Sequence, residues 1–259
     1  MTRKMQMVSE LADQTARDVT QGEREWKQYL GTAARLYKYP FDDQLLIYAQ
    51  RPDATACASM GIWNENMRRW VRAGSKGIAL IHKDGGRPYL TYVFDVRDTR
   101  PVRGARMPYL WEMREDHHAP VLTALEGQYG KTGEGDFGER LMAIGTSAVA
   151  TAYREHLGDL AYDTRESFPE GADGRSMEAA FRDTVAASVR YTLLVRCGLK
   201  PEDYLEEGAL QGITDFSAPD ALHHLGDAVS TLSKNILQEI GRAIVKHERE
   251  RLKEAQKET

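Results

Sequence analysis

The sequence changes from a helical to a strand pattern at residues 78–96, which read IALIHKDGGRPYLTYVFDV. An apolar run at 78–82 leads into Asp84-Gly85-Gly86, which is typical of a tight hairpin turn because glycine tolerates positive φ angles. Residues 89–96 then alternate between apolar and mixed positions, as the side chains of a strand do. This stretch therefore predicts a small antiparallel hairpin.

The chain before the hairpin has helical spacing. Apolar residues recur every three or four positions, and Pro40 and Pro52 each fall where a helix would end. Trp63 lies at the centre of a further short helix or loop, and a Gly-Ser-Lys-Gly turn precedes the hairpin. The expected elements are helices at 1–20, 23–37 and 41–50, a helix or loop at 58–68 and a turn at 74–77.

A basic connector follows the hairpin. Residues 98–108 hold Arg100, Arg103 and Arg106 together with two prolines, which favours an exposed linker at a domain boundary. Helical spacing then returns at 118–129, 136–156, 176–197 and 219–253. We therefore predict an α+β fold with a small helical and antiparallel-hairpin domain at 1–106 and a mostly α-helical domain at 107–259.

The net charge of −4 is unevenly distributed along the chain. Residues 60–106 carry ten Lys and Arg against four Asp and Glu, a net charge of +6. Residues 107–259 carry 17 against 27, a net charge of −10. Such asymmetry favours nucleic-acid binding by one segment and a separate role for the acidic remainder.

Apolar segments and cysteines in the sequence indicate the compartment in which the protein is expected. The longest apolar runs fall short of the roughly 18 residues that cross a bilayer, and the N-terminus has no apolar segment of a secretory signal. Cys57 and Cys197 lie far apart in apolar or helical contexts, which favours two buried, reduced thiols. We therefore expect a cytoplasmic protein without membrane contact.

Basic and aromatic residues cluster around the hairpin. Four cations fall within the nine residues 68–76, and aromatic side chains flank them. Proteins that bind single strands combine cations along the phosphates with aromatic faces on which bases stack. An alternative is that the aromatics form the core of the sheet while the arginines face solvent. The predicted contacts are Arg68, Arg69, Trp70, Arg72, Lys76, Tyr92 and Arg97.

Some aromatic residues of this cluster are expected in the core of the sheet, not at its surface. Trp63 and Phe94 are expected to support the contact turn from the core, and Trp70 alone would also suit a core position. The turn at 74–77 offers backbone N–H groups and a lysine to an anion, but it lacks the spacing and the following helix of a Walker A loop. We therefore expect no nucleotide cofactor.

Residues 26–81, WKQYLGTAARLYKYPFDDQLLIYAQRPDATACASMGIWNENMRRWVRAGSKGIALI, with VFDVRDT at 93–99, resemble the N-terminal domain of ArdC-type antirestriction proteins. Related domains begin large helicase-like proteins of conjugative elements. Asp43 or Gln44 stands where that family has an asparagine. The resemblance covers about a third of the chain and implies binding of single-stranded DNA and protection of incoming plasmid DNA. The matching positions are Gln50, Pro52, Ala54, Thr55, Trp63, Val71, Gly74, Lys76, Gly77, Ile78, Phe94 and Asp95.

The second domain of that family resembles a zinc metallopeptidase with His-Glu-x-x-His. Two histidines one helical turn apart bind the metal and the glutamate polarises its water. This chain lacks the motif, and positions 152 and 160, one turn from His156, are alanine and leucine. His223 and His224 form only a weak alternative pair. We expect a metal-free relative or an unrelated helical bundle, with no metal, cofactor or catalytic site.

Three functions remain open from the sequence. The first is sequence-independent binding of single-stranded DNA in a mobile genetic element, with protection of that DNA from host defence as its role. The second is a protein inhibitor of antirestriction or anti-CRISPR type, which would occupy a host defence nuclease through an acidic surface. The third is a hydrolase whose site has no recognisable motif.

Overall fold

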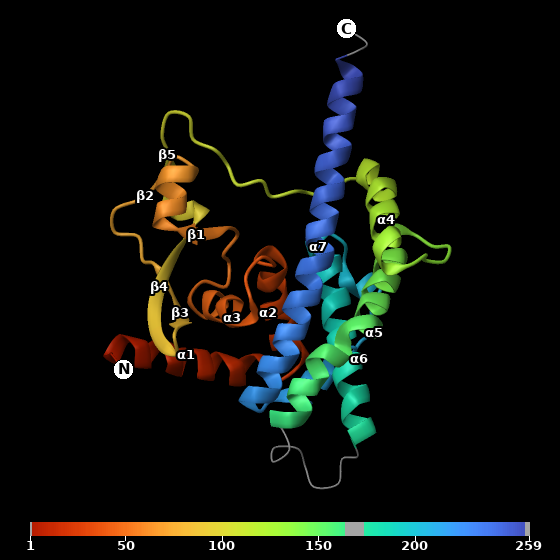
Figure 1. Cartoon of the computed structure of the whole chain (residues 1–259), viewed down its shortest axis with the longest axis horizontal. Helices are drawn as coiled ribbons and strands as arrows, with labels where there is room; N and C mark the ends of the chain where they lie inside the picture. Colours follow the sequence, from red (N-terminus) through yellow and green to blue (C-terminus); the bar gives the residue numbers. More distant parts are fainter. Residues whose placement is uncertain (1, 164–173, 257–259) are drawn as a thin grey trace.

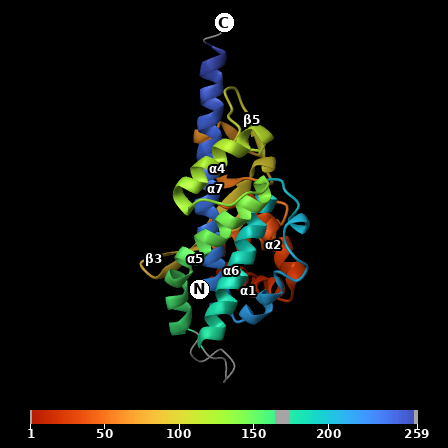
Figure 2. The same ribbon diagram turned by 90° about the vertical axis from the view of Figure 1, so that its right-hand side faces the viewer.

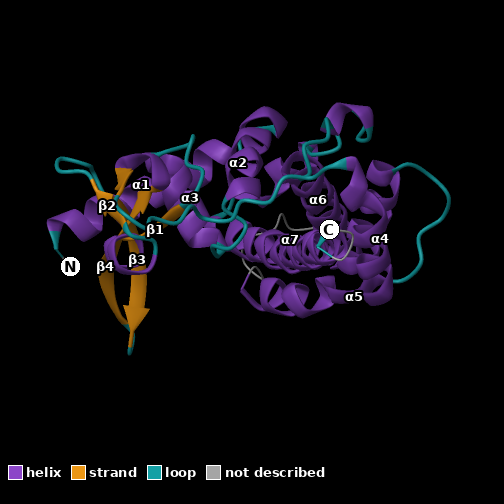
Figure 3. Ribbon diagram, turned by 90° about the horizontal axis from the view of Figure 1, so that it is seen from above, coloured by secondary structure: helices purple, strands orange, loops and turns teal. Residues whose placement is uncertain are grey.

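A computed structural model describes residues 2–163 and 174–256. Its fold is α+β, as the sequence predicts, with the strands gathered at one end of the molecule and a helical bundle at the other (Figures 1 and 3). No helix in the described residues is long and apolar enough to cross a membrane. The part of the predicted loop at 162–175 that spans 164–173 lies outside the described residues.

Three helices open the chain and match the sequence prediction. They are α1 (Arg3–Val19), α2 (Glu23–Arg35) and α3 (Phe41–Gln50). The side chain of Thr2 accepts a hydrogen bond from the backbone of Met5 and caps α1. Asp42 and Asp43 lie in the first turn of α3, where the helix dipole favours negative charge.

The predicted hairpin forms two strands, β3 and β4, of a three-stranded antiparallel sheet in the order β1-β4-β3. Its strands are β1 (Cys57–Ser59), β3 (Ile78–Asp84) and β4 (Arg87–Asp95). Asp84 pairs with Arg87 across the turn, where Gly85 and Gly86 both have positive φ. The Asp-Gly-Gly signal is therefore confirmed.

A second, two-stranded sheet was not predicted. It pairs β2 (Arg69–Val71) with β5 (Thr99–Pro101), and Trp70 lies opposite Arg100. A π-helical turn, Ile62–Asn66, leads into β2, and a 3-10 turn, Val96–Asp98, leads into β5. Residues 98–108 are therefore only partly a connector, because their first residues belong to a strand too short to give a periodic signal.

Four long helices form the bundle and confirm the helical prediction for the second half. They are α4 (Glu115–Tyr129), α5 (Phe137–Asp163), α6 (Gly174–Arg196) and α7 (Pro219–Ala255). Two 3-10 turns, Pro201–Asp203 and Gln211–Phe216, join α6 to α7. The C-terminal end of α7 extends past the other helices in two perpendicular views (Figures 1 and 2).

The main hydrophobic core joins α2 and α3 to the bundle. Trp26 is fully buried, and its Nε1 donates a hydrogen bond to Ser188 Oγ at 2.9 Å. Phe41 of α3 packs so closely on Gly226 of α7 that a Cβ there would lie 2.3 Å from the ring. Residues 1–106 and 107–259 therefore share one interior, and the chain crosses between them through the segment from β5 to α4.

Candidate nucleic-acid interface

The two-stranded sheet presents an exposed tryptophan between arginines. Trp70 is 52% exposed, whereas its strand neighbours Arg69 and Val71 are half-buried. Side chains alternate along a strand, so Arg72 is expected on the same side as Trp70, and Arg100 lies directly opposite Trp70 on β5. An aromatic ring is thereby held at the surface with cations on two sides.

Further exposed cations lie in the chain segments that flank β2 and β5. Within the described ranges 2–163 and 174–256, none of them forms an ion pair with a carboxylate, and Asp98, the acidic residue beside β5, is already paired with Arg51. We call residues 68–76 and 99–106 the basic ribbon. Its exposed cations are Arg68, Arg72, Lys76, Arg100, Arg103 and Arg106.

Backbone hydrogen bonds fix the loop at the end of the basic ribbon. The amide of Val102 donates to the carbonyl of Arg68 at 3.2 Å, and the amide of Arg106 donates to the carbonyl of Met67 at 2.8 Å. Arg68 has a φ of +51°, a conformation that is uncommon for a residue with a side chain and that concentrates at functional sites. The loop thus places Arg103 and Arg106 beside the cations of β2.

Arg69 and Lys76, two predicted contacts, differ in their surroundings. Arg69 donates from Nε to Thr99 Oγ1 at 2.9 Å and so joins β2 to β5. Lys76 is exposed in a turn that packs tightly, because a Cβ at Gly77 would lie 3.1 Å from the ring of Phe94. Glycine at position 77 therefore lets the lysine turn lie against the sheet.

Trp63 and Phe94 support the ribbon from the core, as predicted. The Nε1 of Trp63 donates to the Phe94 carbonyl at 2.8 Å, and both side chains are buried with Val96. This contact fixes the π-helical turn on β4. Of the two tryptophans that suited a core position, Trp63 is buried and Trp70 is exposed.

Two predicted contacts lie away from the ribbon. Tyr92 belongs to β4 in the other sheet, is half-buried, and has Lys4 Nζ 4.7 Å from its ring centre. Arg97 donates to Asp53 Oδ2 at 2.8 Å and to Asp95 Oδ1 at 2.9 Å. Those hydrogen bonds raise the pKa of Arg97, and the two carboxylates balance its positive charge. The structure therefore brings five of the seven predicted residues together, at 68–76.

Asp95 is a buried carboxylate that holds the segment beside the ribbon. It accepts hydrogen bonds from the amides of Thr55 at 2.6 Å and Arg97 at 2.9 Å. Burial alone would raise the pKa of Asp95, but the hydrogen bonds from Thr55, Arg97 and Ala56 lower it below its usual value. The carboxylate is therefore ionised and fully occupied within the fold.

Other residues of the resemblance also serve the framework. Gln50 of α3 donates from Nε2 to the carbonyl of Ala79 and accepts from its amide, both at 2.9 Å, which ties the helix to β3. At the position of the family asparagine, Asp43 and Gln44 are both buried, and Gln44 donates to the carbonyl of Tyr39. Asp43 and Gln44 lie in the interior, and the exposed Gln50 joins α3 to β3, so these side chains serve the framework of the fold.

The histidines do not assemble a metal site in the described residues, where no group of three or more His, Cys, Asp or Glu is arranged to hold an ion. His223 faces Asp42 at 3.0 Å, and this hydrogen bond raises the pKa of the imidazole. His156 lies 3.7 Å from Asp227. Cys57 and Cys197 are free thiols; Cys197 is buried, as predicted, whereas Cys57 is half-buried, and burial raises the pKa of each to about 12.

No protein-family model, curated relative or solved structure matches this chain. The resemblance of residues 26–81 to ArdC-type domains therefore stays a prediction.

The sequence prediction did not include Arg100, Arg103 and Arg106 among the site residues. The structure places them in the basic ribbon, with Arg100 opposite Trp70. An arginine recurs at every third position from Arg97, and this spacing could have indicated a shared role. Because residues 98–108 were predicted to be a connector, nothing in the sequence placed these arginines beside residues 68–76.

Proposed function

We propose that this protein binds single-stranded DNA, independently of sequence, through the basic ribbon. The observation that carries the proposal is the exposed ring of Trp70, which lies opposite Arg100 and among cations without acidic partners in the described residues. Cations would follow the phosphates while one base stacks on the indole, the combination that sequence-tolerant single-strand binders use.

Two arguments favour a single strand of DNA over a duplex. A base can stack on Trp70 only when it has left its own helix, and the ribbon's exposed arginines and lysine bind phosphates without reading base edges. The resemblance of residues 26–81 to ArdC-type domains supports DNA as the strand and a role in protecting the DNA of a mobile element from host defence.

Affinity for a single-stranded oligonucleotide is expected to fall steeply with salt. If the ribbon neutralises about four phosphates, the slope of log affinity against log salt is about −3, a loss of about fiftyfold between 50 and 200 mM. Fluorescence anisotropy with matched single- and double-stranded oligonucleotides would measure this. An affinity indifferent to salt, or a preference for the duplex, would contradict the proposal.

Trp70→Ala is expected to weaken binding by about 1–3 kcal/mol, the typical value of one base stack. The other three tryptophans, Trp26, Trp63 and Trp111, are buried, so quenching of indole fluorescence by the strand would report on Trp70. Trp70→Phe is the matched control, because it keeps an aromatic face but removes the indole signal. Unchanged affinity in Trp70→Ala, or quenching as strong in Trp70→Phe as in the unaltered protein, would remove Trp70 from the site.

An acidic surface supports a second candidate, the protein inhibitor. Four carboxylates, Glu202, Asp203, Glu206 and Glu207, are exposed on the short segment between α6 and α7. Such a surface suits the basic cleft of a nuclease. A complex with a host defence nuclease that survives removal of the ribbon's cations would favour this function over DNA binding.

A further inference from the structure

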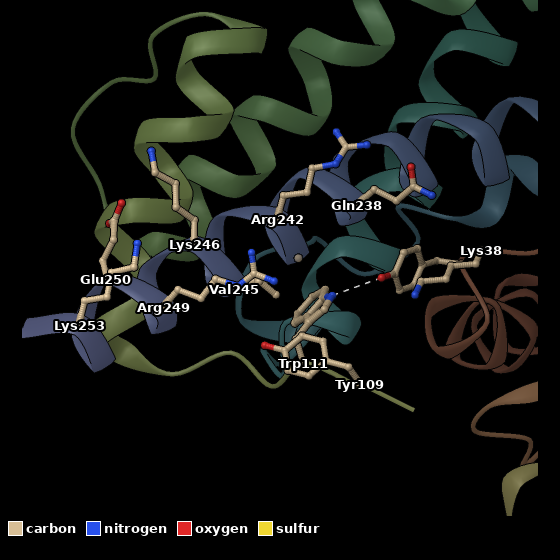
Figure 4. Close-up of a pocket in the computed structure, with 12 residues that line it drawn as sticks. Lys38, Tyr109, Trp111, Gln238, Arg242, Val245, Lys246, Arg249, Glu250 and Lys253 are labelled. Carbon is tan, nitrogen blue, oxygen red and sulfur yellow. Dashed lines mark hydrogen bonds between the residues drawn. The ribbon is translucent and has the colours of Figure 1, made fainter. Parts of the chain in front are cut away.

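A groove lies between the C-terminal half of α7, the segment that follows β5, and the end of α2. Its volume is about 690 Å³. Figure 4 shows the long basic side chains that extend from α7, with Tyr109 and Trp111 on one side of the helix. We call this the α7 groove. Cations and aromatic residues line it, among them Lys38, Tyr109, Trp111, Lys246, Arg249 and Lys253.

The α7 groove is strongly basic although it belongs to the acidic half of the chain. Arg242, Lys246, Arg249 and Lys253 follow one another at intervals of four, three and four residues, which places them along one side of the helix. Arg242 pairs with Glu239 at 2.9 Å. In the described part of the chain, Lys38, Lys246, Arg249 and Lys253 have no acidic partner.

Carboxylates contribute little to this surface. Glu250 is the one acidic residue among those that line the α7 groove in the described chain. Lys38, Lys246, Arg249 and Lys253 outnumber this carboxylate, so the groove carries an excess of positive charge and a polyanion is the complementary ligand.

The aromatic side of the groove is firmly held. Trp111 is buried, and its Nε1 donates to the hydroxyl of Tyr37 at 3.3 Å (Figure 4). The guanidinium of Arg196 lies 3.6 Å from a ring centre of Trp111. Its indole lies so close to Gly241 of α7 that a Cβ there would be 3.0 Å from Nε1. The segment after β5 is thereby fixed against α7.

Tyr109 offers a partly exposed ring at the same place. Its hydroxyl donates to Glu248 Oε2 at 2.9 Å, which fixes the side chain, yet 52% of the residue is exposed. An amphipathic ring with its polar end satisfied and much of its surface in solvent suits the stacking of a base.

A continuous basic path joins this groove to the basic ribbon. Residues 99–111 run from β5 to Trp111 and contain Arg100, Arg103 and Arg106 but no aspartate or glutamate. In Figure 1 this segment crosses from the strands to α7. The cations of ribbon and groove therefore belong to one surface track without an intervening acidic residue in that segment.

We propose that the α7 groove is a second contact for the same single strand, with its phosphates along Lys246, Arg249 and Lys253 and a base on Tyr109. This inference rests on the proposed function. A single phosphate would need only one or two of these cations. The stripe from 246 to 253 rises about 10 Å along the helix, a length that suits more than one phosphate of a strand.

The test is a charge reversal in the groove, Lys246→Glu with Arg249→Glu and Lys253→Glu, measured with oligothymidylates of two lengths. A strand of roughly 8 nucleotides is short enough to occupy one contact, and a strand of roughly 30 is long enough for both. We expect the affinity for the long strand to fall at least tenfold and the affinity for the short strand to change less than threefold.

The matched control reverses three exposed cations elsewhere, Arg17→Glu, Arg24→Glu and Arg182→Glu, and changes the net charge by the same amount. Circular dichroism would verify that both variants keep their helices. If the groove variant binds the long strand as well as the control does, the inference fails while the proposed function stands. If the unaltered protein binds neither strand, the proposed function itself is wrong, and the inference falls with it.

Photocrosslinking gives an independent readout. A long strand that carries 4-thiothymidine is expected to crosslink to peptides that contain Tyr109 or residues 242–253, as well as to the basic ribbon. Crosslinks confined to the ribbon would overturn the second contact.

Discussion

Asp95→Ala is expected to lower the free energy of unfolding by about 3–5 kcal/mol, the typical cost of removing one partner from a buried charged network. The lost carboxylate leaves the amides of Thr55 and Arg97 without their acceptor, and each unsatisfied buried donor is costly. Arg97 also loses one of its two acidic partners. Urea unfolding followed by circular dichroism would measure the change.

Asp53→Ala is the matched control for this effect. Asp53 pairs with the same Arg97 at 2.8 Å, but its side chain is 67% exposed. Exposed ion pairs contribute less than about 1 kcal/mol, so this variant should be close to the unaltered protein. Equal stability losses in the two variants would show that Asp95 acts only as a surface partner of Arg97.

The pH dependence of this difference has a definite sign. The pKa of Asp95 is lower in the folded protein than in the unfolded chain, whose aspartates titrate near 3.9, so its ionised form favours folding. That contribution is fully present above about pH 4 and is lost as the pH falls through the folded pKa. The gap in stability between the unaltered protein and Asp95→Ala should therefore narrow in acid.

Local periodicity in the sequence was sufficient to predict the helices and the hairpin. The helix at Phe41–Gln50 has the predicted limits, because Pro40 and Pro52 bracket it, and the turn at Gly85 and Gly86 follows from glycine's tolerance of positive φ. The pairing of β2 with β5 could not be predicted from the sequence. Each of these strands has three residues, and their partners are some thirty positions apart.

The candidate site was predictable where its members are neighbours in the chain. Arg68 to Lys76 lie together because they form one strand and the turns beside it. The ion pair of the predicted contact Arg97 with Asp53, 44 positions away, had no local signal in the sequence. The α7 groove was not predicted from the sequence. Its cations belong to a segment with a net charge of −10, and they lie on one side only once that segment is wound into a helix.

The residues that carry the family resemblance and those that would touch DNA are largely different sets. Gln50, Thr55, Trp63 and Asp95 make internal hydrogen bonds that join α3, the turn before β1, the π-helical turn and β4. Lys76 is the exception, since it belongs to the resemblance and is exposed in the ribbon. A shared framework would thus preserve the position of β2 and β5 while the cations on them vary.

Reversal of three ribbon cations, Arg72→Glu with Lys76→Glu and Arg100→Glu, is expected to reduce the affinity for single-stranded DNA at least a hundredfold at low salt. A unit charge 4 Å from a phosphate contributes about 1 kcal/mol in water, and reversal replaces that attraction with a similar repulsion. The slope of log affinity against log salt should also become shallower by about 2, because three counterion releases are lost at about 0.7 each.

These three side chains suit the experiment because they are exposed and make no side-chain hydrogen bond or ion pair in the described residues, so their reversal should leave the fold intact. The triple variant of Arg17, Arg24 and Arg182 is again the control, since it alters the net charge equally and leaves the ribbon unchanged. If both triple variants weaken binding to the same extent, overall charge and not the ribbon governs the interaction. A ribbon variant that binds with unaltered affinity and salt slope would show that the DNA binds elsewhere. Three reversed charges beside Trp70 would repel the phosphates of any strand bound there.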